Sequence, residues 1–310
     1  MARIASTVLV VALLAATAAA FALTQGLKSQ PSPIFGTEPG DVFSPVCGCD
    51  TRTATIAFKL REDDTLDVAI VDGGEVVRTI ERGRDYDRGP VQIEWDGRDD
   101  SGRLLPEGEY LPRVHLREDR STITLPNPIR IDVTPPRLEL LPVRRRVFSP
   151  DGDRRADRVT FRYRLDEPGR AMLLVDGKRR VRTKFARTED KLEWFGKVGG
   201  RALPAGTYTA RVAAFDPAGN VGARSRPITI VIRYVALGRD RISVPAGARF
   251  AVRVSSDART VRWEFGGRSS VVRPGTLRLR APLQTGRFTL AVTANGHTVR
   301  AAVFVREPAR

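Results

Sequence analysis

Hydrophobic and polar residues alternate in short runs along most of this chain. Such runs cover residues 54–60, 159–165, 250–254 and 288–292, and Gly, Pro, Asn, Asp or Ser lie between them. A period of two places every second side chain on the same face of a strand, so the hydrophobic set of each run is expected to be buried. The pattern predicts an all-β protein made of short strands joined by tight turns.

The clearest hairpin signal lies in residues 92–110. This stretch alternates into Trp95, turns through Asp-Gly and Ser-Gly pairs, and enters a second alternating run after a Pro and a Gly. Glycine supplies positive φ and proline presets a turn, so the two flanking runs are predicted to pair. A reduced copy follows at residues 191–208, centred on Trp194.

These hairpins belong to two copies of one longer pattern. A Phe-Ser-Pro turn at Phe43 precedes an alternating run, and the same order begins again at Phe148. Residues 43–60 align with residues 148–165 without a gap. In each copy an Asp-Gly hairpin comes next, and then the tryptophan hairpin. Because the order of motifs is the same twice, we predict two equivalent modules.

The motifs resemble those of the FlgD-type immunoglobulin-like domain. Members typically read Phe-Ser-Pro-Asn-Gly-Asp at the first turn, Trp-Asp-Gly-Arg-Asp-Ser-Gly at the tryptophan hairpin and Pro-Ala-Gly-x-Tyr after it. The likeness covers about residues 42–133 and 147–231, and it is most specific at residues 95–102. The second copy lacks the acidic turn after Trp194. The resemblance implies β-sandwiches used as spacers or interaction modules, without catalytic chemistry.

A third module is expected at the C-terminal end. Six alternating runs lie between Arg241 and Val305, and they predict another small sandwich with Trp263 in its core. The predicted fold class is all-β, with three tandem immunoglobulin-like β-sandwiches after an N-terminal transmembrane helix. The expected segments are an anchor or signal at 1–28, a Pro-rich tether at 29–41, FlgD-type modules at 42–136 and 137–235, and a basic module at 236–310.

The N-terminal segment is uncharged from residue 4 to residue 27. This length exceeds the 7 to 15 residues of a usual signal h-region and is enough to cross a hydrocarbon core of about 30 Å. We therefore expect an uncleaved single-pass anchor in the cell membrane, with the bulk of the chain outside the cytoplasm. Small residues at Ala18, Ala20 and Ala22 also fit a cleavage pattern, so the alternative is secretion after signal cleavage.

Charge is concentrated in the third module. The chain has a net charge of +16, and residues 239–310 hold 14 Arg, no Lys and four acids. Guanidinium groups bind phosphate and carboxylate bidentately, so an anionic wall polymer or nucleic acid is a suitable partner. The alternative is an arginine-rich solvated face without a dedicated ligand. Alternation predicts that six arginines project outward as candidate polyanion contacts: Arg249, Arg253, Arg262, Arg278, Arg280 and Arg300.

Cys47 and Cys49 are the only cysteines, and they are two residues apart. An exported chain would be expected to pair them, although a disulfide between such close residues closes a small ring. Three interpretations stay open: a local structural disulfide, a redox-active pair, and cysteines that are free or bonded to another chain. A zinc site is disfavoured because only His115 and His297 could complete it.

Asp151, Asp153 and Asp157 form the candidate metal site. They lie two and four residues apart on a Gly-containing loop, a spacing of oxygen ligands that suits calcium. The alternative is an Asx-turn in which Asp151 caps its own backbone. In the first copy, Asp96, Asp99 and Asp100 are interpreted as turn formers.

No nucleophile, zinc-protease or phosphate-loop motif occurs in the sequence, and His115 and His297 are expected in a strand and beside a hairpin turn. We therefore expect a non-enzymatic envelope scaffold or binding protein, with no small-molecule substrate and no cofactor except calcium. It would contact the membrane through its N-terminal helix and an anionic wall polymer or an envelope protein through its basic module. The alternative is a thiol-redox envelope protein that uses Cys47 and Cys49.

Overall fold

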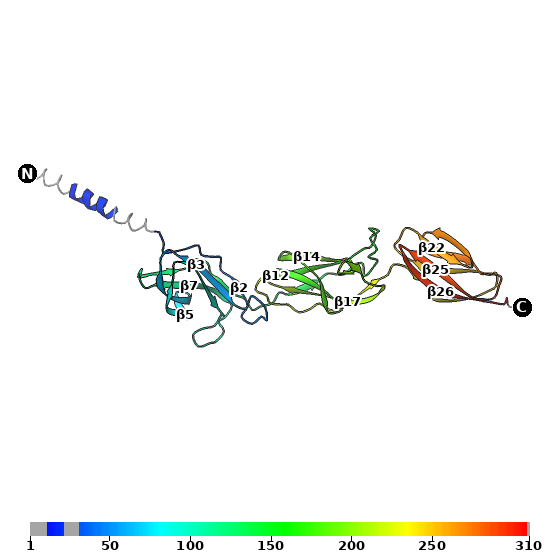
Figure 1. The fold of residues 1–310 in the computed structure, drawn as a ribbon, viewed down its shortest axis with the longest axis horizontal. Coiled ribbons are helices and arrows are strands. Elements are labelled where there is room, and N and C mark those ends of the chain that lie inside the picture. Colours follow the sequence, from blue (N-terminus) through cyan, green and yellow to red (C-terminus); the bar gives the residue numbers. More distant parts are fainter. Residues whose placement is uncertain (1–10, 22–30, 309–310) are drawn as a thin grey trace, which may run out of the picture. The chain divides into compact units, whose positions relative to one another are not determined.

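The computed structural model describes residues 11–21 and 31–308 of the chain. Residues 11–21 form a helix, and β-strands make up the elements of the second range (Figure 1). The expected all-β class is therefore confirmed. No helix in these two ranges has both the length and the hydropathy of a membrane span. The other residues of the expected anchor, 1–10 and 22–28, lie outside the described residues.

The chain divides into two compact units, Met1–Val133 and Thr134–Arg310. The first unit contains the first predicted module. Its strands are β1 (Ile34–Phe35), β2 (Val42–Phe43), β3 (Ala54–Leu60), β4 (Asp64–Asp72), β5 (Glu75–Tyr86), β6 (Gly89–Trp95), β7 (Gly108–Leu116), β8 (Ser121–Thr124) and β9 (Ile129–Ile131).

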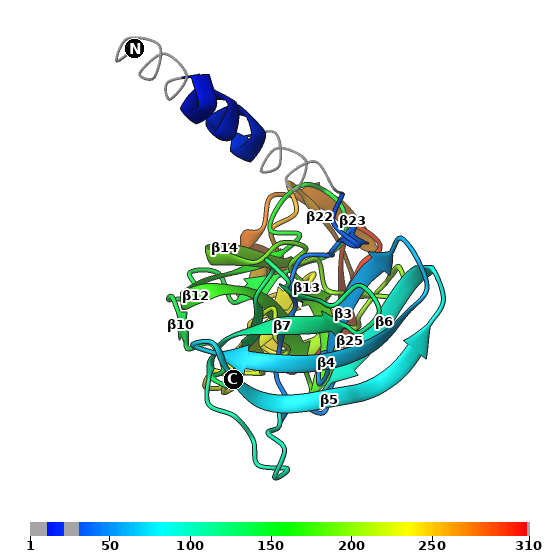
Figure 2. The same cartoon turned by 90° about the vertical axis from the view of Figure 1, so that its left-hand side faces the viewer.

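These strands form two sheets around one core. One sheet has the order β1-β3-β6, and the other has the order β2-β9-β7-β4-β5 with β8 beside β7. Figure 2 shows β4, β5 and β7 side by side, as their pairing requires. Alternation places Ile56, Phe58 and Leu60 inside, as predicted. The segment predicted as a tether also contributes an edge strand, because Ile34 packs into this core while β1 pairs with β3.

The second module repeats this plan within the second unit. Its sheet β10-β12-β14 corresponds to β1-β3-β6, and its order β11-β18-β17-β12-β13 corresponds to β2-β9-β7-β4-β5. One difference in layout is β12, which runs through both sheets with an irregularity between Arg164 and Gly169. In addition, β8 lies beside β7 in the first module, whereas β15 pairs with β16 in the second. The strands are β10 (Leu138–Leu140), β11 (Val147–Phe148), β12 (Val159–Val175), β13 (Lys178–Arg182), β14 (Arg187–Trp194), β15 (Lys197–Val198), β16 (Arg201–Ala202), β17 (Gly206–Phe215) and β18 (Ile228–Ile232).

Trp95 and Trp194 occupy equivalent surroundings. Each is at most 3% exposed and packs against the phenylalanine of its Phe-Ser-Pro turn, with ring centroids 5.5 and 5.8 Å apart. Each indole N–H donates to the backbone oxygen three residues further on, at 3.1 and 3.3 Å. The tyrosines that follow, Tyr110 and Tyr208, both donate to a proline carbonyl four residues earlier at 2.8 Å. The predicted equivalence of the two modules is therefore present in the packing as well as in the order of strands.

The third module is a smaller pair of sheets, also within the second unit. The orders are β19-β21-β24 and β20-β26-β25-β22-β23, and Figure 1 shows β22, β25 and β26 side by side. All six predicted runs lie in strands, whereas β19 and β23 were not predicted. The strands are β19 (Ala236–Leu237), β20 (Arg241–Pro245), β21 (Arg249–Ser255), β22 (Val261–Phe265), β23 (Arg268–Val272), β24 (Gly275–Arg280), β25 (Gly286–Ala294) and β26 (His297–Arg306).

Trp263 differs from its prediction as a core residue. It is only half-buried and packs against the edge of the third hydrophobic core, which is centred on residues such as Leu290, Val292 and Val303. Its neighbours on β22, Val261 and Phe265, take the fully buried positions. Alternation predicted the inward direction of Trp263 correctly, but it does not indicate how far across the sheet the core extends.

Candidate polyanion-binding site

The third module has a basic groove with an aromatic lining. The groove has a volume of about 720 Å³, and its walls come from both sheets, through β21 and β24 on one side and β22 and β23 on the other. Phe250, Trp263 and Phe265 line it, and the rings of Phe250 and Phe265 meet edge to face at 5.5 Å. Four arginines complete the lining: Arg249, Arg268, Arg278 and Arg280.

The guanidinium groups of this groove are largely unpaired. Arg280 donates from Nε to the Gly247 carbonyl at 2.8 Å. Across residues 236–308, no arginine makes an ion pair with a carboxylate. Arg249 and Arg280 lie directly opposite each other on β21 and β24, which places two like charges side by side. An anion bound between them would relieve this repulsion.

The six predicted arginines do not form one cluster. Arg249, Arg278 and Arg280 line the groove. Arg253 is exposed further along β21, opposite Thr276, and does not line it. Arg262 and Arg300 are exposed on β22 and β26, which belong to the other sheet.

Arg268 and the aromatic lining of the groove were not predicted from the sequence. Arg268 begins β23, a strand whose residues Arg-Ser-Ser-Val-Val show no alternation. A Phe-Gly-Gly turn precedes it, and that hairpin signal could have paired residues 268–272 with β22.

Cys47 and Cys49 are bonded to each other. The disulfide closes the turn after Phe43, with the two Cα atoms 5.2 Å apart. The hydroxyl of Thr51 lies 3.1 Å from the sulfur of Cys49. The same turn is held by a backbone hydrogen bond from Ser44 N–H to the Thr51 carbonyl at 3.0 Å. This intramolecular disulfide is common to the structural and the redox interpretations. Neither cysteine is free in the structure.

The three candidate calcium ligands lie together on the corresponding turn of the second module. One carboxylate oxygen from each of Asp151, Asp153 and Asp157 lies within 4.8 Å of the other two. Asp151 accepts a hydrogen bond from the N–H of Asp153 at 3.3 Å, as the Asx-turn alternative requires. Asp157 accepts from the N–H groups of Gly152 and Arg154, both at 2.7 Å.

Two residues of the third module contact this turn. The side-chain amide of Asn295 donates to Asp151 at 3.0 Å and to Asp153 at 3.1 Å. The hydroxyl of Ser149, which is fully buried, donates to the carboxylate of Asp257. Burial raises the pKa of the Asp257 carboxyl above its ordinary value, and the hydrogen bond from Ser149 offsets only part of this rise. Neither Asn295 nor Asp257 was predicted, because their role depends on the folding of two modules against each other.

The junction between the second and third modules also contains His297. Its ring stacks on Tyr234 with centroids 3.5 Å apart and an angle of 5° between the planes. His115, the other histidine, lies on β7 with Nδ1 2.9 Å from the hydroxyl of Thr122. One imidazole therefore stacks on a tyrosine ring, and the other lies within hydrogen-bond distance of a threonine on the neighbouring strand.

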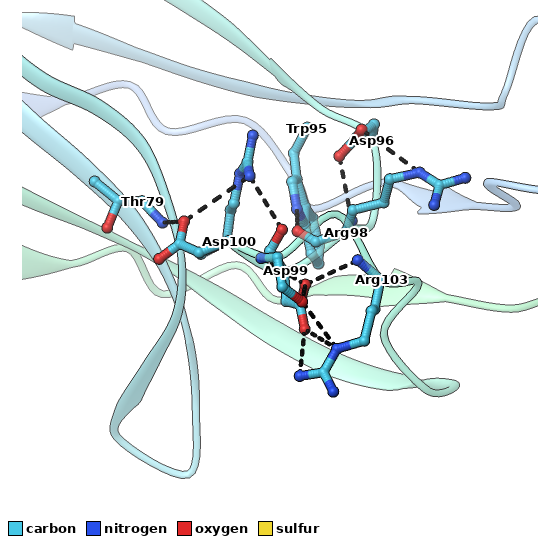
Figure 3. A network of polar contacts seen from close by, with 9 residues as sticks. Thr79, Trp95, Asp96, Arg98, Asp99, Asp100 and Arg103 are labelled. Atoms are coloured by element: carbon cyan, nitrogen blue, oxygen red, sulfur yellow. Dashed lines mark hydrogen bonds and ion pairs between the residues drawn. The ribbon is translucent and has the colours of Figure 1, made fainter.

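The acidic turn after Trp95 is closed by its own side chains (Figure 3). Asp99 accepts hydrogen bonds from the Ser101 hydroxyl at 2.6 Å and from the Ser101 and Arg103 N–H groups, both at 2.9 Å. These bonds, with that of Ser101 the strongest, lower the pKa of Asp99 to about 2. Asp100 accepts from Thr79 N–H at 2.9 Å and so ties the turn to β5. The carboxylates therefore act as turn formers.

The comparisons identify the family of the first module. Residues 49–119 match the FlgD Ig-like domain, which confirms the expected family. The matched residues lie in the first module; the second module resembles the first in its strand order and packing. No curated protein matches the sequence.

Three solved structures are examples of those that this chain matches. An I-band fragment of titin has 12% identity and a TM-score of 0.27, over 90% of this chain and 100% of that one. The chicken CNTN1 FN1–FN3 domains have 12% identity and a TM-score of 0.25, over 89% and 100%. E. coli alpha-2-macroglobulin has 11% identity and a TM-score of 0.28 over 88% of this chain, which spans 22% of that protein. Likeness at these values carries no information about ligands.

Proposed function

We propose that this chain, whose first module is a FlgD Ig-like domain, is a non-enzymatic scaffold or binding protein of the cell envelope. In this proposal the third module presents its groove to an anionic wall polymer or to an acidic surface of an envelope protein. The observation that carries the proposal is the set of unpaired arginines around Trp263 and Phe250.

The chemistry of the groove suits an anionic polymer. Guanidinium groups bind carboxylate and phosphate in a fork geometry, and a low-dielectric wall strengthens their field. The ring of Trp263 is half-exposed in the groove, so it offers a flat apolar surface beside the charges. A chain with regularly spaced anionic groups would therefore find both its charges and its apolar faces matched.

Binding of a short anionic oligosaccharide to the full chain tests this function. We expect the variant Arg249→Gln/Arg268→Gln/Arg278→Gln to lose about 10- to 100-fold in affinity, because three exposed ion contacts disappear. The matched control is Arg253→Gln/Arg262→Gln/Arg300→Gln, which removes the same charge from the same module outside the groove. Equal losses in the two variants would reduce the effect to net charge and would contradict the groove.

The proposed location rests on the uncharged segment at residues 4–27. We propose a single-pass anchor, with secretion after cleavage as the alternative. Fractionation of cells into membrane and secreted material decides between them. Full-length chain in the membrane fraction supports the anchor, and a chain that has lost its first residues in the medium supports cleavage.

Thiol exchange through Cys47 and Cys49 stays a prediction of a different class. It requires the disulfide to be reduced and reformed with a partner dithiol. Incubation of the oxidised protein with a reduced thioredoxin-type donor measures this exchange. Transfer that is lost in Cys47→Ser/Cys49→Ser supports it, and a disulfide that stays intact under these conditions excludes it.

Calcium binding at Asp151, Asp153 and Asp157 also stays a prediction. Its support is the convergence of three carboxylates on one short turn. Calcium is expected to raise the melting temperature of the second module, and Asp153→Asn is expected to remove the increase. Magnesium serves as the control because it demands a smaller octahedral site. An equal rise with both ions, or no rise, would leave the Asx-turn as the explanation.

A further inference from the structure

We propose that the second module has its own groove for an anionic polysaccharide, a glycan chain that carries carboxylate or phosphate groups. This groove has a volume of about 980 Å³. Its lining comes from the outer faces of β12 and β14 and from two loops, at residues 141–145 and 154–158. It shares no lining residue with the groove of the third module.

The lining of this groove is strongly cationic. It includes two acids, Asp157 and Glu193, and six exposed cations: Arg144, Arg145, Arg154, Arg158, Arg162 and Lys191. Glu193 is already paired with Lys191 at 3.0 Å and with Arg158 at 3.5 Å. Asp157 accepts backbone N–H groups of its own turn.

The remaining arginines are available to a ligand. Arg144, Arg145, Arg154 and Arg162 make no ion pair with any carboxylate in residues 31–308. Several like charges on one concave surface focus the field and favour an anion over solvent. A neighbouring hollow of about 510 Å³ shares Arg145 and Arg154 and adds Arg155, Arg233 and one acid, Asp257. The cationic surface therefore extends along a track, which suits a polymer better than a single small anion.

The first module shows that this charge is not a general property of the scaffold. The gapless alignment places Cys49 at the position of Arg154, Thr53 at that of Arg158 and Ala57 at that of Arg162. The strand registers agree, because Thr55 lies opposite Glu94 just as Thr160 lies opposite Glu193. At these three positions the surface is therefore uncharged in the first copy and basic in the second, while Arg52 of the first copy lies at the position of Asp157. A uniform arginine-rich composition does not explain this difference.

A glycan fits the groove better than a nucleic acid does. Phe195 lines the groove and is 44% exposed, with the guanidinium of Arg158 at 5.6 Å from its ring centroid. An exposed ring beside cations can pack against a sugar ring while the cations bind its acidic groups. The disulfide between Cys47 and Cys49 is typical of an oxidising, extracytoplasmic compartment, and a partner outside the cytoplasm favours a glycan over a nucleic acid.

Titration calorimetry of the full chain with a short oligogalacturonate tests the inference. We expect two sites per wild-type chain, one in each groove. The variant Arg144→Gln/Arg154→Gln/Arg162→Gln should weaken the site of the second module by about 10- to 100-fold and leave the site of the third module unchanged. The control Lys178→Gln/Arg179→Gln/Arg201→Gln removes the same charge from exposed positions of the second module outside the groove and should keep both sites.

The arms of this experiment separate the two proposals. If only the third-module variant weakens binding at a site, the inference fails while the proposed function stands. If only the second-module variant weakens binding, the inference stands while the proposed function fails. Phe195→Ala should weaken oligogalacturonate binding about three- to tenfold and leave inorganic polyphosphate binding unchanged. Equal effects of groove and control variants, or tighter binding of a single-stranded oligonucleotide in the same groove, would overturn the inference.

Discussion

The first and second modules are copies of one scaffold that use the same turn for different purposes. In both, the serine of the Phe-Ser-Pro turn donates its backbone N–H to a carbonyl seven residues later at 3.0 Å. In the first, the Cys47–Cys49 disulfide lies within this turn. In the second, carboxylates close the turn and Asn295 of the third module binds it. The backbone is thus set by a few core positions, which leaves the other turn residues free to acquire separate roles.

The largest effects are expected where the two modules are alike. Trp95→Ala and Trp194→Ala should each lower the free energy of unfolding of their own module by about 3–5 kcal/mol, because a large fully buried side chain leaves a cavity. Trp263→Ala is the control, since that half-buried side chain should cost less than about 2 kcal/mol. Calorimetry that resolves the separate transitions measures all three. A second-module transition unaffected by Trp194→Ala would break the equivalence.

A sharper contrast is expected at the serine of the shared turn. Ser44 Oγ is buried without a hydrogen-bond partner among the described residues, whereas Ser149 donates to Asp257. Ser149→Ala should therefore cost about 1–3 kcal/mol, because it removes a donor from a carboxylate that is partly buried. Ser44→Ala should be neutral or slightly stabilising. Urea unfolding of both variants gives the comparison, and equal values would show that the contact with the third module contributes nothing.

Much of this scaffold was predictable from sequence because its signals are local. The structural effect of Trp95, of the Phe-Ser-Pro turns and of the Asp-Gly hairpins depends on residues close to them in the sequence. Alternation and turn chemistry were therefore enough to locate the strands around them. The candidate sites depend on distant residues. Arg268 enters the groove of the third module from a strand without alternation, and Asp257 reaches the turn of the second module from another sandwich. The spacing of residues along the sequence carries no information about contacts between residues that are far apart in it.

The disulfide of the first module and the carboxylates of the second should stabilise their turns by similar amounts. Both contributions to the free energy of unfolding should be smaller than those of the buried tryptophans. Cys47→Ser/Cys49→Ser is expected to destabilise the first module by about 1–2 kcal/mol, since the disulfide closes a very short loop and removes little entropy from the unfolded chain. Asp157→Ala should destabilise the second module by about 1–2 kcal/mol through the loss of its backbone hydrogen bonds. Unfolding with and without reductant provides the control, because only the first module of the wild-type protein should respond to reductant.

The smallest difference between the first and second modules is expected in their stability at acid pH. It arises in the turn that follows each tryptophan. Hydrogen bonds from Ser101 and Arg103 hold the pKa of Asp99 at about 2, whereas residues 195–202 of the second module contain no acid. The pKa of Asp99 is thus lower in the folded than in the unfolded chain, so its contribution is complete above about pH 4 and is lost as the pH falls towards 2. Asp99→Asn should lower the melting temperature of the first module at neutral pH, and the gap from wild type should narrow between pH 4 and 2. The second-module transition should be the same in both proteins at every pH, because no carboxylate holds its equivalent turn. A gap that persists unchanged down to pH 2 would mean that the shape of the turn, rather than the charge of Asp99, stabilises this part of the first module.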